Sequence, residues 1–156
     1  QHYENILNQD ADYISEVLNK IKQCYLALNE IANFELFLVK ANQIKHNSSV
    51  DLALTEFIEQ KDGQEAAQSR LYQQVRQYPN MLTFHRFIYY QINEAEEGRA
   101  KESLVLLHKM VGDRIQKGFQ YRCLHCGYQS YRLTWYCPSC RHWESIKPIQ
   151  SIADVI

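Results

Sequence analysis

Four cysteines near the C-terminus have the spacing of metal ligands: Cys123 and Cys126, then Cys137 and Cys140, with ten residues between the two pairs. Two Cys-x-x-Cys pairs this close together can place four thiolates around one tetrahedral ion. Such a site is coordinatively closed, which argues against hydrolytic metal catalysis because no position is left for water or substrate. Zinc and iron both accept four thiolates, so the sequence leaves the choice of metal open.

Two disulfides in a secreted domain are the alternative for these four cysteines. The sequence contains no signal-peptide pattern and no apolar run of the roughly 18 residues that would span a bilayer. The fifth cysteine, Cys24, lies in a stretch of helical periodicity, where we expect a buried free thiol. One buried free thiol, together with four cysteines at metal-ligand spacing, favours a reducing compartment. We therefore expect a soluble, cytosolic chain.

The residues next to the cysteines indicate tight turns. Gly127 follows the first pair and Pro138 lies inside the second, and both fit turns whose backbone amides point at the ligand sulfurs. Because four cysteines already fill a tetrahedron, we expect His125 and His142 to be solvent-exposed and not to be ligands. Three further histidines have no partner at metal-ligand or triad spacing and are expected to be ordinary core or surface residues: His46, His85 and His108.

Aromatic and basic residues alternate around the cysteines, as they do in ribbons that bind nucleic acid. The basic ones are Arg122, Arg132, Arg141 and Lys147. Residues 1–113 hold 11 Lys and Arg against 16 Asp and Glu, whereas residues 114–156 hold 6 against 2. We therefore expect the basic residues to face the acidic first part of the chain or an anionic partner, and we do not expect nucleic acid to be that partner.

Apolar residues recur at helical spacing through the first 117 residues, which predicts six helices after a short stub near residues 3–7. The stub resembles the end of a helix that starts upstream. We expect Ser48 or Ser49 to cap the third helix, an Asp62–Glu65 capping box to start the fourth and Asn80 to cap the fifth. Gly118 is expected to end the sixth helix.

The six helices form three pairs at a spacing of roughly 32 to 35 residues, which is the period of tetratricopeptide arrays. A plain antiparallel bundle with the same helices is the alternative. The predicted fold class is mainly α, a tetratricopeptide-like helical array followed by a small zinc-ribbon β module. The predicted domains are helical repeats over residues 1–117, a metal-binding module over 118–150 and a tail over 151–156.

The β module has too little core to fold alone, so a bound metal must supply folding free energy on the order of 10 kcal/mol. Only Gly118 separates the module from the last helix. We therefore expect the module to dock rigidly on the last helical unit and to bury Phe119, Trp135 and Trp143 there.

The sequence contains no catalytic constellation. A Gly-rich phosphate loop, a Ser/His/Asp arrangement and paired catalytic carboxylates are all missing from it. We therefore expect a protein without enzymatic activity.

Three runs around the cysteines resemble a known family. They are Tyr121-Arg-Cys-Leu-His-Cys-Gly-Tyr128, Leu133-Thr-Trp-Tyr-Cys-Pro-Ser-Cys140 and Trp143-Glu-Ser-Ile-Lys-Pro-Ile149. These runs resemble the C-terminal rubredoxin-type module of the bacterial lipopolysaccharide assembly protein B family. The helical repeats before the module are similar too, so the resemblance covers the whole chain as part of a longer protein.

The resemblance implies an adaptor at the cytoplasmic side of the inner membrane, held there by an N-terminal anchor outside this chain. Its implied partners are the membrane protease FtsH, the deacetylase LpxC, whose degradation it would control, and lipopolysaccharide assembly proteins. Formation of a homo-oligomer stays open. The implied cofactor is one iron or zinc ion bound by Cys123, Cys126, Cys137 and Cys140.

The chain departs from electron-transfer rubredoxins in two ways. Those proteins usually have a glycine after each cysteine pair and a much longer segment between the pairs, whereas Arg141 follows the second pair here. A side chain at this position crowds a turn that favours positive φ. The departures favour a structural metal, and an electron-transfer or nucleic-acid-binding protein with the same metal ribbon remains the alternative.

Overall fold

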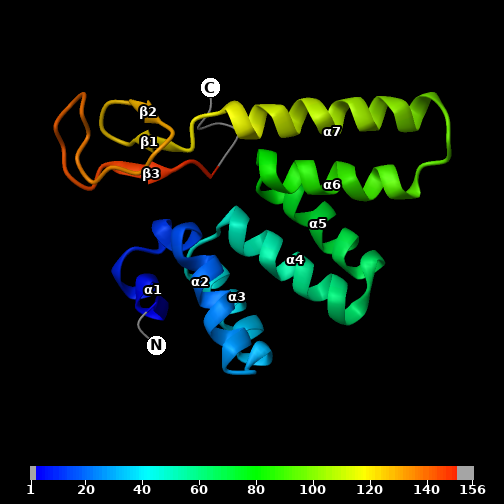
Figure 1. Ribbon diagram of the computed structural model, residues 1–156, viewed down its shortest axis with the longest axis horizontal. Coiled ribbons are helices and arrows are strands. Elements are labelled where there is room, and N and C mark those ends of the chain that lie inside the picture. The colour runs from blue at the N-terminus through cyan, green and yellow to red at the C-terminus, as the bar shows by residue number, and fades with distance from the viewer. Residues whose placement is uncertain (1–2, 151–156) are drawn as a thin grey trace.

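The computed structural model describes residues 3–150 and shows a helical array followed by a small sheet (Figure 1). The helices are α1 (Ile6–Gln9), α2 (Ile14–Ala27), α3 (Ile31–Ile44), α4 (Ser48–Asp62), α5 (Gln64–Gln77), α6 (Met81–Glu94) and α7 (Arg99–Lys117). The strands are β1 (Tyr121–Cys123), β2 (Gln129–Ser130) and β3 (Ile146–Pro148). The predicted fold class, mainly α with a small β module at its end, is confirmed. The predicted tail over residues 151–156 lies outside the described residues.

Each long helix packs mainly on its neighbours in the chain, and α4 also packs on α2 and α6. Successive helices run in opposite directions, as α6 and α7 show at the top of Figure 1. Contacts restricted to near neighbours are what a helical repeat array is built from. In the described part of the chain, no helix is both long enough and apolar enough to cross a membrane.

Two hydrophobic clusters hold the array together. The first joins α2, α3 and α4 and consists of Ile14, Leu18, Ile21, Phe34, Phe37, Leu38, Ala41, Val50 and Leu54. The second joins α5 and α6 through Ala67, Leu71 and Tyr90, with Leu52 and Ile58 of α4 packed against it. Burial of each large side chain contributes roughly 1.5–3 kcal/mol, so these interhelical clusters stabilise the array.

The helix starts differ in part from the sequence prediction. Asn47, and not Ser48 or Ser49, caps α4, because its side chain accepts hydrogen bonds from the amides of Ser49 and Val50. The Asp62–Glu65 capping box is also wrong: Asp62 still belongs to α4, and α5 starts after Gly63 without a side-chain cap.

The two remaining helix-end predictions are confirmed. The Asn80 side chain accepts from the amide of Thr83 and so caps α6. Gly118 follows the last residue of α7 in an extended conformation, with φ −77° and ψ 152°. A Cβ at Gly118 would lie 2.9 Å from the carbonyl oxygen of Arg114, so a larger residue could not leave the helix along this path.

His46, His85 and His108 each make a side-chain contact in the structure. His46 lies after α3, where it contacts the fully buried carboxylate of Asp51 and stacks on Tyr78. His85 of α6 and His108 of α7 stack with ring centroids 3.8 Å apart. Burial, together with the charges of His108 and Arg86, lowers the pKa of His85. These pairs were hidden in the sequence because their members lie on different helices or turns.

Cys24 is exposed, so the expected buried thiol is wrong. The residue lies on α2, whose buried face is formed by Ile14, Leu18 and Ile21. In the last turn of α2 it is the neighbouring Tyr25, and not Cys24, that packs against Phe34 and Phe37 of α3.

The cap at Asn47 gives a direct test of the helix starts. Replacing Asn47 by alanine should lower the free energy of unfolding by about 1 kcal/mol, because two amides of the first turn lose their acceptor. Ser49→Ala is the matched control and should change it by less than about 0.5 kcal/mol. Urea denaturation followed by far-ultraviolet circular dichroism measures both, and a larger loss for Ser49→Ala would contradict the assignment of the cap.

Candidate metal centre and its docking surface

Two similar turns carry the four cysteines. In the first, the Gly127 amide donates to the Cys123 carbonyl over 2.9 Å, and Gly127 has φ +78°. In the second, the Arg141 amide donates to the Cys137 carbonyl over 2.9 Å, and Arg141 has φ +62°. The positive φ predicted for Arg141 is thus confirmed, and each turn places its two thiols on the same side of the backbone.

Short strands hold the turns together. The sheet has the order β2-β1-β3 with antiparallel pairing, and β1 pairs Cys123 with Ile146 of β3. A single bridge between Tyr136 and Trp143 closes the second turn. Backbone pairing therefore encloses each cysteine pair, with β1 and β2 around the first and the Tyr136–Trp143 bridge around the second.

The structure brings the four predicted cysteines together. Their sulfur atoms all lie within 4.8 Å of one another, with 3.7 Å between Cys123 and Cys140 and 3.7 Å between Cys126 and Cys137. Sulfurs bound tetrahedrally at about 2.3 Å from one ion would be about 3.8 Å apart. A disulfide would need about 2.05 Å between sulfurs. The spacing therefore fits a four-thiolate metal site.

Backbone amides point at the sulfurs, as we predicted from the turn residues in the sequence. Burial opposes ionisation of Cys123, but Ser145, whose Oγ lies 3.3 Å from the sulfur, and the amides of Cys126 and His125 lower its pKa to about 6. A metal ligand must be deprotonated, so Cys123 is prepared for metal binding at neutral pH.

Cys126 is exposed and Cys140 is half-buried, whereas Cys123 and Cys137 are buried. The Tyr128 amide lowers the pKa of Cys126. The His142 amide favours the thiolate of Cys140, but burial and the neighbouring cysteine sulfurs outweigh it and raise the pKa of Cys140 to about 12. Four adjacent thiols cannot all ionise without a cation between them. The donor set thus fits a metal ion that offsets this repulsion.

The module docks on the N-terminal segment and not on the last helix. The Tyr13 hydroxyl donates to the carbonyl oxygen of Ile146 over 2.9 Å in a buried position. The Tyr13 ring also packs against Trp135, with centroids 5.1 Å apart. Figure 1 shows the sheet beside the first helices, so the C-terminal module returns to the start of the array.

Lys147 supplies the charge contact of this surface. Its ammonium group pairs with Asp10, lies 4.0 Å from Asp12 and lies 4.3 Å from the centre of the Tyr13 ring. Desolvation raises the pKa of Asp10, but the lysine outweighs it and the net shift is downward. Lys147 therefore confirms, for one residue, the expectation that basic groups of the module face acidic helices.

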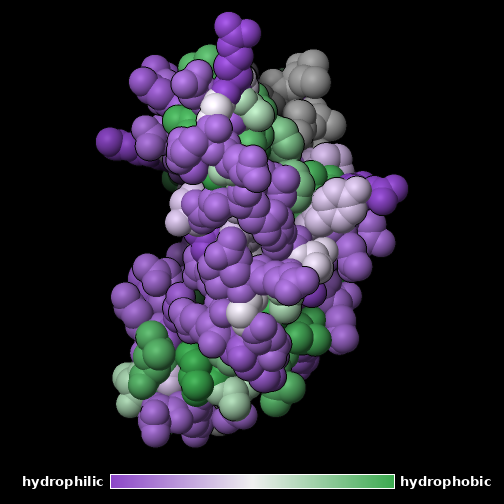
Figure 2. Space-filling model, turned by 90° about the vertical axis from the view of Figure 1, so that its right-hand side faces the viewer, coloured by the Kyte–Doolittle hydropathy of each residue, from purple (hydrophilic) through white to green (hydrophobic). Residues whose placement is uncertain are grey.

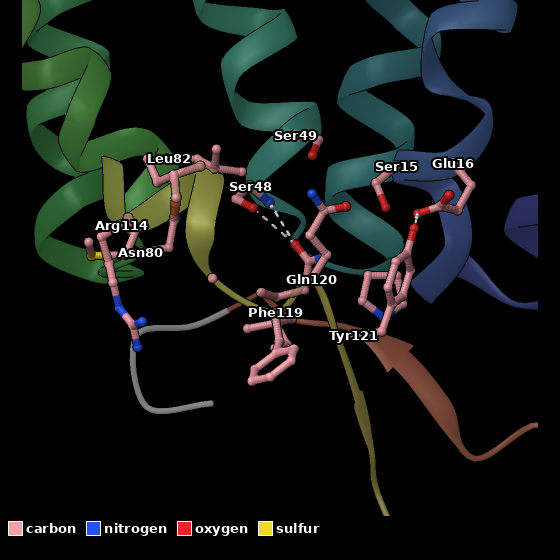
Figure 3. Close-up of a pocket in the computed structure, with 16 residues that line it drawn as sticks. Ser15, Glu16, Ser48, Ser49, Asn80, Leu82, Arg114, Phe119, Gln120 and Tyr121 are labelled. Atoms are coloured by element: carbon pink, nitrogen blue, oxygen red, sulfur yellow. Dashed lines mark hydrogen bonds between the residues drawn. The ribbon is translucent and has the colours of Figure 1, made fainter. Parts of the chain in front are cut away.

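Two further contacts lie beside a cleft of about 260 Å³ between the module, the N-terminal ends of α2, α4 and α6 and the C-terminal end of α7 (Figure 3). The Tyr121 hydroxyl donates to Glu16 over 2.9 Å, and burial together with this bond raises the pKa of Tyr121 to about 12. The amide and hydroxyl of Ser48 both donate to the side-chain oxygen of Gln150. Gln150, at the end of the module, is thus bound to the start of α4.

The expected docking on the last helix is wrong. Phe119 is 42% exposed, Trp135 54% and Trp143 71%, and their ring partners include Tyr131 for Phe119 and Tyr136 for Trp143. The extended backbone at Gly118 turns the chain away from α7. The sequence did not reveal Tyr13, Asp10 or Glu16 as partners, and its only hint was the opposite charge of the two parts.

Comparison with known proteins agrees with this architecture. A family described as "Rubredoxin metal binding domain" matches residues 121–148. The chain is 57% identical over 148 residues to lipopolysaccharide assembly protein B of Haemophilus influenzae, covering 95% of this chain and 37% of that protein. It is 42% identical over 149 residues to the protein of the same name from Escherichia coli K12, covering 96% of this chain and 38% of that protein. The chain therefore spans little more than a third of these relatives.

The buried hydroxyl of Tyr13 tests the docking surface. Tyr13→Phe should lower the free energy of unfolding of the metal-loaded protein by about 1 kcal/mol, because the Ile146 carbonyl loses its donor inside the interface. Tyr72→Phe is the control, since Tyr72 is 50% exposed. It should change stability by less than about 0.5 kcal/mol. Equal effects in urea denaturation would show that the Tyr13 bond does not hold the module.

Proposed function

Because the chain belongs, over the part of its relatives that it spans, to the lipopolysaccharide assembly protein B family, we propose that it acts in lipopolysaccharide assembly as a non-enzymatic adaptor. The finer proposal is that it works with the protease FtsH to control degradation of LpxC. Its proposed place is the cytoplasmic side of the inner membrane, to which the full-length protein is anchored. The similarity to two relatives of that name, over 95% and 96% of this chain, supports this proposal.

The proposed metal ligands are the four cysteines at positions 123, 126, 137 and 140, which bind one zinc or iron ion in a structural role. Four thiolates leave no open position for chemistry. Cys123 and Cys137 are 1% and 0% exposed and form half of the buried core of the module. An ion bound there would therefore stabilise the fold of the module. In the proposed domain division, helical repeats span residues 1–117 and the metal-binding module spans residues 118–150.

An exposed apolar face on α7 supports binding to a protein partner. One side of α7 packs on α6 through Val111, whereas Val105, Leu106 and Met110 are 49%, 60% and 60% exposed. The end of the array seen in Figure 2 is largely hydrophilic; hydrophobic groups gather at its lower edge, away from α7, and smaller ones show between polar groups at the top. Helical arrays bind partners through such extended surfaces, which agrees with an adaptor.

Electron transfer is the second candidate function, and the exposure of Cys126 favours it. A thiolate at the surface can pass an electron if the ion is iron. Zinc has no redox chemistry, so replacing iron by zinc separates the two functions. A structural role requires that zinc-loaded protein supports LpxC turnover as well as iron-loaded protein does.

The metal ligand Cys137 gives the decisive variant for the adaptor. Cys137→Ser should unfold the module, because the site loses a thiolate from a fold with little other core, while the helices stay folded. LpxC should then persist in bacteria that carry the full-length variant. Near- and far-ultraviolet circular dichroism report on the module and the helices, and a chase after blocking protein synthesis reports on LpxC.

Cys24→Ser is the matched control, because it removes an exposed thiol far from the module in sequence. It should leave the fold and LpxC turnover unchanged. Normal LpxC turnover with an unfolded module would overturn the proposal that the module is part of the adaptor. Loss of turnover with zinc in place of iron would instead favour the redox function.

A further inference from the structure

Two histidines cover the outer edge of the cysteine centre. His125 comes from the first turn and His142 follows the second, and their rings stack with centroids 3.6 Å apart and 22° between planes. Both side chains are exposed. The expectation that they face solvent is therefore met, but they are not two unrelated surface residues.

The pair lies beside one of the sulfurs. The ligand atoms of His125, Cys140 and His142 all lie within 4.8 Å of one another. The Cys140 sulfur therefore belongs to two clusters, one with the other three cysteines and one with the two imidazoles. The left-handed backbone of Arg141, φ +62°, turns the chain so that His142 folds back toward Cys140.

A hydrogen bond sets the tautomer of His142. Its Nδ1 lies 3.1 Å from the carbonyl oxygen of Cys140. A carbonyl oxygen can only accept, so Nδ1 carries the proton and Nε2 keeps a lone pair for a metal ion. A backbone carbonyl bound to the second nitrogen is the usual arrangement of a metal-ligating histidine.

We propose that His125, Cys140 and His142 form a second metal site, which takes a zinc ion and shares the Cys140 thiolate with the four-cysteine centre. Two imidazoles and a thiolate are ligands that zinc accepts, and a water molecule completes the tetrahedron. Four thiolates around one divalent ion leave a net charge of about −2, which attracts a second cation to the exposed edge. The second site is open and exposed, so it binds more weakly than the first.

The test uses the full chain loaded with one equivalent of zinc and then titrated with cobalt. The wild type should develop the absorption of tetrahedral cobalt together with a thiolate-to-cobalt charge-transfer band, while the first zinc stays bound. In the double variant His125→Asn/His142→Asn this cobalt signal should be lost or weakened by about tenfold or more. Asparagine keeps the backbone amides that donate to the sulfurs, so the first site should bind its zinc as before.

Two outcomes would overturn the proposal. An unchanged cobalt signal in the double variant, with zinc released in proportion, would mean that cobalt only replaces zinc among the four cysteines. A cobalt signal without the charge-transfer band would exclude Cys140 from the site. His108→Asn, which breaks the other stacked histidine pair with no cysteine in its cluster, is the control and should leave the signal intact. Failure of the first equivalent of zinc to bind would instead refute the proposed four-thiolate centre on which this inference rests.

Discussion

The small β module depends on the sulfur cluster because it has almost no other core. Its buried cluster consists of Tyr121, Cys123, Cys137 and Ile146, so two of the four members are cysteines. Strands of two or three residues cannot hold such a module by backbone pairing alone. In the proposed centre, a metal ion that ties four thiolates together would replace the missing core and would give the helices a rigid partner.

Because the β module docks on the first helices, the helical array also depends on the sulfur cluster. A repeat array normally interacts only between neighbours, so its two ends are independent. Here the residues after the last helix return to the first ones: Ile146 receives the Tyr13 hydroxyl, Lys147 meets Asp10, and Gln150 accepts from Ser48. The contacts join segments more than 100 residues apart in the chain and close the array on itself. Loss of the metal would therefore destabilise the start of the array.

Features set by local sequence were predictable. Helical periodicity found the six long helices, Asn80 and Gly118 marked two helix ends, and the position of Arg141 in its turn predicted a positive φ. The spacing of the cysteines placed their sulfurs together for the same reason, since each pair lies within one turn. Caps were less reliable, because Asn47 and its two serine neighbours are all good capping residues and only the backbone path selects one of them.

Features set by the closure of the whole chain were not predictable. We expected the module to pack on α7 because only Gly118 separates the two. A one-residue connection keeps the module near the end of α7 but does not determine the direction in which the chain leaves the helix. The extended backbone at Gly118 and the acidic surface near Asp10 decide where the module lies. Stacked pairs such as His85 with His108 were hidden for the same reason, since their members meet only when two helices pack.

Hydrogen exchange with and without the metal tests most directly whether the metal centre holds the start of the array. The reporter is the amide of Ser48, which donates to the Gln150 side chain over 3.3 Å. We expect removal of the metal to speed exchange in the β module, at Ser48 and in the first turns of α2, while the middle of α6 and α7 stays protected. Faster exchange at the end of α7 with Ser48 and α2 unchanged would contradict it.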